Sequence, residues 1–406
     1  MIVLVLGSGL AKVVAFLAIP IITRIYEPSA FGELSIFMAI VAIVSPLLSL
    51  RYLMAIPIVK SDRVAINILF LCFCFVTINT VALAAFVYIG YDILLNIRFF
   101  SNTSPNISML FIAIYLTSIS ELLILWGTRK KKFTILSKSL VFQSLLGVLV
   151  KIALGLLNIK ELGLIIGQIV QQGSGSILLA KNFASDINKL IKDISVKKII
   201  LLTCYFSDLP KFRLPSQVLL VIATQLPILF CAAIYNESTT GQLGLALTTL
   251  AIPIQLFGNS TGKVYFSEVS SIGKYNKSVI RSVTNKLVIR LFLFSLFPTV
   301  TLAFFGEYLF VKIFGSNWQL AGNIAEIIAI SLMFQFISMP IVNLLTVLEK
   351  QKTFLIINAM RMLLVLLALS TSYIMTASVE TMMIIYSGAL SLSYICTLLI
   401  IYKNMR

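Results

Sequence analysis

The chain has 406 residues, of which 59% are hydrophobic and 12% are charged, and its mean hydropathy is +1.02. A soluble domain carries about 25% charged residues, so this composition excludes a protein that buries its apolar surface in one aqueous core. The apolar segments are long and continuous, and only helices or closed barrels satisfy the backbone inside a bilayer. We therefore predict an all-α integral membrane protein.

Twelve apolar runs are long enough to cross a bilayer, which takes about 20 helical residues. The first run has no small-x-small cleavage site before Arg24, so we interpret it as a retained helix and not as a signal peptide. In chain order the predicted spans cover residues 2–23, 33–57, 64–90, 106–128, 134–157, 161–180, 214–236, 242–263, 286–305, 322–347, 353–375 and 380–401.

The basic residues predict the orientation of these spans. If both termini are cytoplasmic, most of the 32 Lys and Arg residues fall on the cytoplasmic side, and the outer loops hold only Arg24, Arg98, Lys160 and Lys312. This asymmetry is what the positive-inside rule predicts. The net charge of +17 therefore reflects topology, with the lipid bilayer and its anionic inner leaflet as the expected partner and no nucleic acid.

One short corner occurs twice. The sequence RIYEPSAFGEL at 24–34 and the sequence AIYNESTTGQL at 233–243 share five identities, among them Tyr26 and Tyr235. The corner joins spans one and two and again spans seven and eight, so an even number of spans separates the copies. This placement predicts a parallel repeat of two six-helix halves, at 1–180 and 199–406, with a cytoplasmic linker at 181–198. Paired halves indicate alternating access around a site between them.

The residue types argue against membrane-embedded catalysis. The chain has no His, which excludes a His-based metal site, a Ser–His dyad and a His proton relay, and its five Cys are scattered. Glycines in GQIVQQGSGSI at 167–177 lie inside span six, where small residues let helices pack closely. Gln168, Gln171 and Gln172 of this run are candidate hydroxyl-binding groups. We expect no enzymatic activity, no cofactor and no metal.

Several stretches together resemble a known family. They are PIITRIYEPSAFGELSIF at 20–37, SPLLSLRYLMAIPIVKSD at 45–62, SDLPKFRLPSQVLLVIATQLPILF at 207–230 and FGSNWQLAGNIAEIIA at 314–329. They are similar to Wzx-type polysaccharide flippases of the multidrug/oligosaccharidyl-lipid/polysaccharide (MOP) exporter superfamily, and the resemblance covers nearly the whole chain. It implies a MOP/MATE-like fold.

The resemblance also implies a function and a location. Such a protein moves an undecaprenyl-pyrophosphate-linked oligosaccharide, the repeat unit of a lipopolysaccharide O-antigen or a capsule, across the bacterial cytoplasmic (inner) membrane. A complex with a polysaccharide polymerase is compatible with this function. Pyrophosphate cannot cross hydrocarbon unaided because it would lose its hydration, so a cationic, water-filled cleft is expected to replace that hydration.

Charged residues within the predicted spans are the candidate site, because intramembrane charges are costly and usually functional. We expect Lys12, Arg51, Lys151 and Arg361 to bind the substrate's pyrophosphate and sugars, the alternative for each being snorkelling or a structural ion pair. Glu121 is the one carboxylate well inside a span. It either pairs with a buried cation or binds the proton or sodium ion that drives transport.

Three other functions stay open. A drug exporter of the same superfamily would carry acidic residues in its cavity, whereas cations predominate within these spans. A membrane enzyme of polysaccharide assembly tends to have a large outer loop, and the longest one predicted here is 91–105. A scaffold that transports nothing would not explain the paired halves or the buried cations.

The predicted topology can be tested by labelling single engineered cysteines in intact cells. Positions Lys131 and Lys192 are expected to be protected from a membrane-impermeant reagent, and positions Asn102 and Ser238 to react, because of the distribution of basic residues. Labelling at position 192 from outside would invert the topology and remove the argument for a parallel repeat.

Overall fold

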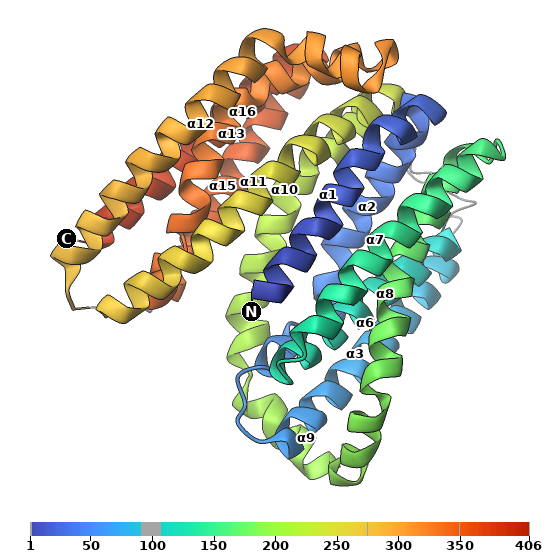
Figure 1. Cartoon of the computed structure of the whole chain (residues 1–406), viewed down its shortest axis with the longest axis vertical. Coiled ribbons are helices and arrows are strands. Elements are labelled where there is room, and N and C mark those ends of the chain that lie inside the picture. Colours follow the sequence, from blue (N-terminus) through green and yellow to red (C-terminus); the bar gives the residue numbers. More distant parts are fainter. Residues whose placement is uncertain (1, 91–106, 274, 349, 406) are drawn as a thin grey trace. The chain divides into compact units, whose positions relative to one another are not determined.

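A computed structural model of the chain describes residues 2–90, 107–273, 275–348 and 350–405 (Figure 1). All regular structure in these ranges is helical, and the predicted outer loop at 91–105, with Arg98 and Asn102, lies outside them. The elements are α1 (Ile2–Ile25), α2 (Pro28–Leu48), η1 (Tyr52–Ala55), α3 (Asp62–Ile89), α6 (Ile107–Arg129), α7 (Phe133–Leu156), α8 (Lys160–Leu190), η3 (Ile191–Asp193), α9 (Val196–Tyr205), η4 (Leu209–Arg213), α10 (Leu214–Ile234), α11 (Glu237–Ile272), α12 (Lys277–Phe314), η5 (Ser316–Trp318), α13 (Gln319–Ile341), α14 (Leu344–Val347), α15 (Gln351–Ile374) and α16 (Val379–Asn404).

Twelve helical segments in the described ranges are long and apolar enough to cross a membrane, which confirms the predicted all-α membrane architecture. Their outer surfaces carry large apolar side chains, such as Phe86 (74% exposed), Phe297 (80%) and Phe304 (74%). In water such exposure would be strongly unfavourable, whereas lipid tails cover these side chains in a bilayer. The chain is a multi-pass membrane protein.

The chain forms two compact units, Met1–Val221 and Ile222–Arg406, here called the N-unit and the C-unit. The division falls within α10, and the segment expected as the linker, 181–198, consists of the end of α8, η3 and the start of α9. In the N-unit α8 packs against α2, α6 and α7, and α1 lies along α7 (Figure 1). In the C-unit α13 packs against α11, α12 and α16, and α15 lies along α16.

The two units repeat the same helix pairs. The pairs α2–α6, α3–α6, α6–α8 and α7–α8 of the N-unit recur in the C-unit as α11–α13, α12–α13, α13–α16 and α15–α16. Each recurring pair joins the same two spans when the spans of each half are counted from one to six. The packing within the units therefore has the periodicity that the repeated corner predicted.

Span two is shorter than predicted. It was expected to reach residue 57, and the structure ends α2 at Leu48. Leu50 and Arg51 then have φ angles of 47° and 61°, and the short turn η1 follows. A left-handed backbone cannot continue a right-handed helix, so the chain turns here although most of its side chains remain apolar. Arg51 consequently lies after α2 and not within a span, which corrects its predicted position.

Spans eight and nine belong to helices longer than predicted. Helices α11 and α12 have 36 and 38 residues, or about 54 and 57 Å at 1.5 Å per residue. The hydrocarbon layer is only about 30 Å thick, so both helices extend beyond it. The polar segment expected between them as a cytoplasmic loop is therefore mostly helical, and only residues 273–276 separate α11 from α12.

The repeated corner makes the same kind of contact in both units. The Tyr26 hydroxyl donates to the Lys151 carbonyl of α7 at 2.8 Å, and the Tyr235 hydroxyl donates to the Ala377 carbonyl, just beyond α15, at 2.7 Å. Burial raises the pKa of both phenols, so both hydroxyls stay protonated and remain donors. Helices α7 and α15 contain the fifth spans of the two halves. The corner therefore ties the first span to the fifth in each unit.

A matched pair of glycine substitutions tests this contact. A Cβ atom on Gly163 would lie 2.4 Å from the Tyr26 hydroxyl oxygen, whereas one on Gly388 meets no atom within 4 Å. Gly163→Ala is expected to lower the free energy of unfolding by about 1–3 kcal/mol through overpacking, and Gly388→Ala to leave it unchanged or raise it. Thermal unfolding of the purified protein in detergent measures both.

A double-mutant cycle locates the cause. Tyr26→Phe removes the hydroxyl and is expected to cost about 1 kcal/mol alone, because the Lys151 carbonyl loses a donor. Combined with Gly163→Ala, it relieves the clash, so the double variant should lose less stability than the two single losses added together. Strictly additive losses would contradict a close approach of Tyr26 to α8.

Candidate functional site

Lys151 is a buried cation on α7 of the N-unit, with 9% of the residue exposed. Its ammonium donates to Gln168 Oε1 at 2.6 Å and to Gln171 Oε1 at 3.0 Å, both on α8. Neither partner is charged, and no ion pair among the described residues includes Lys151. Dipoles alone stabilise this ammonium, so its charge is not neutralised and can attract an anion strongly in a medium of low dielectric constant.

Two glycines allow this arrangement by letting α7 and α8 approach closely. A Cβ atom on Gly167 would lie 2.3 Å from Lys151 Cγ, and one on Gly147 would lie 2.5 Å from Gln171 Cβ. Any side chain at either glycine would push the helices apart and separate the ammonium from its two amide acceptors. The two glycines thus allow close helix packing, as expected for small residues inside a span.

The three glutamines proposed to bind hydroxyl groups of a substrate already have partners within the N-unit. Gln168 and Gln171 hold the Lys151 ammonium, and Gln172 Oε1 accepts a hydrogen bond from the Thr117 hydroxyl of α6 at 2.7 Å. The amide oxygens of Gln168 and Gln171 therefore hold the Lys151 ammonium, and that of Gln172 links α8 to α6. Binding of sugar hydroxyl groups by these glutamines remains a prediction.

Arg361 is a half-buried cation on α15 of the C-unit. Its Nε donates to Ser393 Oγ on α16 at 3.2 Å, and its guanidinium carbon lies 4.7 Å from the centre of the Tyr394 ring. No ion pair among the residues that the structure describes includes Arg361. These contacts engage Nε and one face of the guanidinium, which leaves the forked terminal nitrogens available to an anion.

Lys151 and Arg361 lie on equivalent spans, at different distances from the start of their helices. Lys151 lies 18 residues beyond Phe133, about 27 Å along α7, and Arg361 lies ten residues beyond Gln351, about 15 Å along α15. Both helices contain the fifth span of their half. Each unit therefore carries, on its fifth span, a cation held only by neutral groups.

Lys12 adds a second cation to the N-unit. It is half-buried on α1, and the carbonyl of the preceding Ala11 accepts a hydrogen bond from Ser144 Oγ of α7 at 2.7 Å. This contact and the Tyr26–Lys151 bond show that α1 and α7 run parallel. Lys12 thus lies near the level of Ser144, about 10 Å below Lys151 along the axis of α7.

Arg51 differs from Lys151 and Arg361, because it has a carboxylate partner. Its NH1 lies 2.7 Å from Glu121 Oε1 of α6, and the two side chains are 6% and 34% exposed. The buried Arg51 Nε and Ser49 Oγ have no hydrogen-bond partner among the residues that the structure describes. One interpretation of Glu121 from the sequence was that it pairs with a buried cation. The structure shows such a pair, with Arg51 as the cation. The predicted roles of Arg51 in substrate binding and Glu121 in ion coupling stay predictions.

Sequence reasoning gave Arg129 no role beyond its charge. In the structure its side chain is 8% exposed, and its guanidinium lies 2.8 Å from Asp62 Oδ1. The guanidinium also donates to three backbone carbonyls, those of Ile56, Val59 and Lys60. It thereby fixes the segment between η1 and α3. An acidic residue at the start of a predicted helix, Asp62, was the available signal, but its partner on another helix cannot be inferred from spacing.

The fold defines the class of protein. Similar solved structures include an inward-facing multidrug resistance MATE family transporter of the MOP superfamily, with a TM-score of 0.63 and 13% identity over 98% of this chain and 94% of that one. A MATE in complex with MaL6 has a TM-score of 0.66 and 12% identity, over 100% of this chain and 94% of that one. A MOP superfamily transporter from Pyrococcus furiosus has a TM-score of 0.64 and 13% identity, over 100% of this chain and 95% of that one. The chain therefore has the fold of MOP superfamily transporters.

The family follows from the sequence. Residues 21–323 match the family described as polysaccharide biosynthesis protein, and the chain belongs to that family. No curated protein matches the chain. The resemblance to Wzx-type flippases that the sequence motifs indicated is confirmed.

The Arg51–Glu121 pair can be tested by removing one partner and then both. Glu121→Leu leaves a nearly buried guanidinium without its counter-ion and is expected to lower the free energy of unfolding by about 3 kcal/mol. Arg51→Met combined with Glu121→Leu should recover most of that loss, because no buried charge remains. Thermal unfolding in detergent, together with protein abundance in the membrane, provides the measurement.

A more exposed pair provides the control. Arg63 and Asp193 lie 3.7 Å apart with side chains 75% and 32% exposed, so Arg63→Met should cost less than about 1 kcal/mol. If the double variant at 51 and 121 is as unstable as Glu121→Leu, the pair does not stabilise the N-unit through charge neutralisation.

Proposed function

We propose that this protein is a flippase that moves an undecaprenyl-pyrophosphate-linked oligosaccharide from the inner to the outer leaflet of the bacterial cytoplasmic membrane. The observation that carries the proposal is the pair of cations, Lys151 and Arg361, which sit in membrane-spanning helices with neutral partners only. The family, whose description is polysaccharide biosynthesis, supports a glycan as cargo, and the transporter fold supports its movement.

The charge of the site suits a pyrophosphate. Burying a pyrophosphate without compensation is prohibitive, because its charges lose their hydration. A cation already surrounded by protein has lost most of its own hydration, so an approaching anion gains a strong attraction at little further cost. The forked nitrogens of Arg361 suit two phosphate oxygens, whereas the ammonium groups of Lys12 and Lys151 act as point charges.

Alternating access is the proposed mechanism, with both termini in the cytoplasm. The repeated helix pairs of the two units support it, since transporters built from such repeats switch by rigid-body movement of their halves. The cations on α1, α7 and α15 would stabilise the pyrophosphate during its passage. The isoprenoid tail remains in lipid throughout, and the sugars follow the pyrophosphate.

Coupling through Glu121 is a separable part of the proposal. Its Oε1 accepts from Arg51, so a proton or sodium ion that binds this carboxylate would compete with the ion pair. A variant with Arg51→Met and Glu121→Leu that folds but loses transport would support coupling. The same variant transporting normally would assign the pair a structural role alone.

A drug exporter is the second candidate, because two of the similar structures are described as a multidrug resistance transporter and a MATE in complex with MaL6. The similar protein from Pyrococcus furiosus is described as having a binding pocket of reverse polarity that suggests a different function. The carboxylate-free cations on α7 and α15 would repel a cationic drug. They favour an anionic cargo here.

Substitutions of Arg361 test the proposal in a strain that lacks its flippase and regains surface polysaccharide when the wild-type chain is expressed. Arg361→Ala is expected to abolish surface polysaccharide, and Arg361→Lys to retain part of it, because Lys keeps the charge and loses the fork. Lys151→Met should also abolish export. Protein abundance in the membrane is measured for each variant.

The matched control is Arg290→Ala, which removes an exposed arginine from another membrane-spanning helix, α12. It should leave export unchanged. Full export by both Arg361→Ala and Lys151→Met at normal abundance would refute the cationic site. Restored export of a cationic drug, with no effect on polysaccharide, would favour the second candidate.

A further inference from the structure

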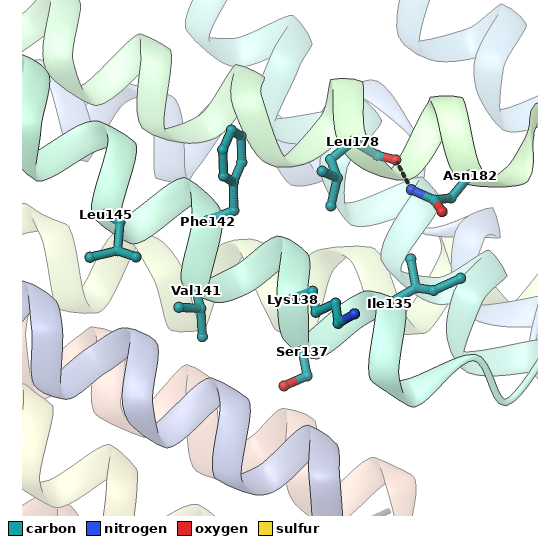
Figure 2. Close-up of a pocket in the computed structure, with 8 residues that line it drawn as sticks. All are labelled: Ile135, Ser137, Lys138, Val141, Phe142, Leu145, Leu178 and Asn182. Carbon is teal, nitrogen blue, oxygen red and sulfur yellow. Dashed lines mark hydrogen bonds between the residues drawn. The ribbon is translucent and has the colours of Figure 1, made fainter.

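A groove of about 550 Å³ lies on the surface of the N-unit between α7 and α8. Six of its lining residues come from α7, namely Ile135, Ser137, Lys138, Val141, Phe142 and Leu145, and two from α8, Leu178 and Asn182. Figure 2 shows Asn182 and Ile135 toward one end of the groove and Leu145 at the other. The groove belongs to neither of the cation sites described above.

The groove is polar at one end and apolar along the rest of its length. Lys138 and Asn182 are exposed at the polar end, and Phe142 and Leu145 are 44% and 45% exposed further along α7 (Figure 2). Lys138 lies five residues beyond the start of α7, about 8 Å along its axis, and Leu145 lies about 10 Å further. With the predicted topology, Lys138 lies about 6 Å inside the inner end of span five, so its long side chain reaches back toward the inner-leaflet phosphates. The apolar part of the groove follows the acyl chains.

Lys138 differs from Lys130 and Lys132 in its charge partners. Lys130 lies 2.6 Å from Asp62 and Lys132 lies 2.7 Å from Asp186, so the local carboxylates are engaged. No ion pair within the described ranges includes Lys138. A membrane-facing ammonium beside an apolar groove is complementary to a lipid with an anionic headgroup.

We propose that this groove binds one anionic phospholipid of the inner leaflet. Its phosphate accepts hydrogen bonds from the Lys138 ammonium and from the second N–H of the Asn182 amide, whose first N–H already donates to the Leu178 carbonyl. One acyl chain lies along Val141, Phe142 and Leu145. The site is independent of the transported cargo, and its occupant stabilises the α7–α8 pair that also holds Lys151.

The test measures thermal stabilisation of the delipidated protein in detergent by phosphatidylglycerol, by phosphatidylcholine with the same chains and by inorganic phosphate. Phosphatidylglycerol alone should stabilise at low concentration, because only it provides both a net negative charge and a chain. Lys138→Ala should weaken its apparent affinity about fivefold, the effect of about one basic residue near a membrane surface. Lys138→Arg should restore it.

Two further variants distinguish binding in this groove from non-specific attraction of anionic lipids to the basic residues of the protein. Val141→Trp keeps the charge and fills the groove, so it should weaken binding as well, while Lys189→Ala removes an exposed lysine of α8 outside the groove and should not. Each variant is first checked for unchanged unfolding without lipid. Equal effects of Lys138→Ala and Lys189→Ala, or normal binding by Val141→Trp, would overturn the proposal. Displacement of phosphatidylglycerol by a lower concentration of an isoprenyl phosphate would also overturn it and assign the groove to the cargo.

Discussion

The structure depends on one constraint, which is that hydrocarbon supplies no hydrogen bonds and no counter-ions. Every polar group inside the bilayer must find its partner within the protein. Just beyond the ends of spans one and two, Tyr26 donates to a backbone carbonyl and Arg51 pairs with Glu121. Within span five, the Lys151 ammonium donates to two neutral amides, which leave its positive charge uncompensated. A site of positive potential in an apolar medium is the result.

The same constraint links the repeat to the proposed function. In each unit the corner tyrosine binds a backbone carbonyl on or just beyond the helix of the fifth span, and that helix carries the cation without a carboxylate. In the N-unit one residue, Lys151, both accepts the tyrosine bond at its carbonyl and presents the ammonium. In the N-unit the helix that the tyrosine ties to the first span is thus also the one that holds the charge.

The twelve spans could be predicted because hydropathy over about 20 residues records membrane crossing directly. The break at Leu50 and Arg51 could not, since most of the surrounding side chains are apolar and no glycine marks the left-handed backbone. Lys151 and Arg361 were identifiable as charges within spans, whereas their partners Gln168 and Tyr394 lie on other helices. Contacts between helices depend on rotation and register, which a single sequence does not encode in its spacing.

The central claim is that cations inside the membrane-spanning helices stabilise an anionic headgroup as it crosses. Flipping of two tagged lipids in vesicles containing the purified protein tests it most directly. The two lipids share an isoprenoid tail and an oligosaccharide, and only one has a pyrophosphate between them. We predict that the pyrophosphate lipid flips rapidly, that the neutral analogue does not, and that Lys151→Met combined with Arg361→Ala removes the difference. Equal flipping of the two lipids by the wild-type protein would contradict the claim.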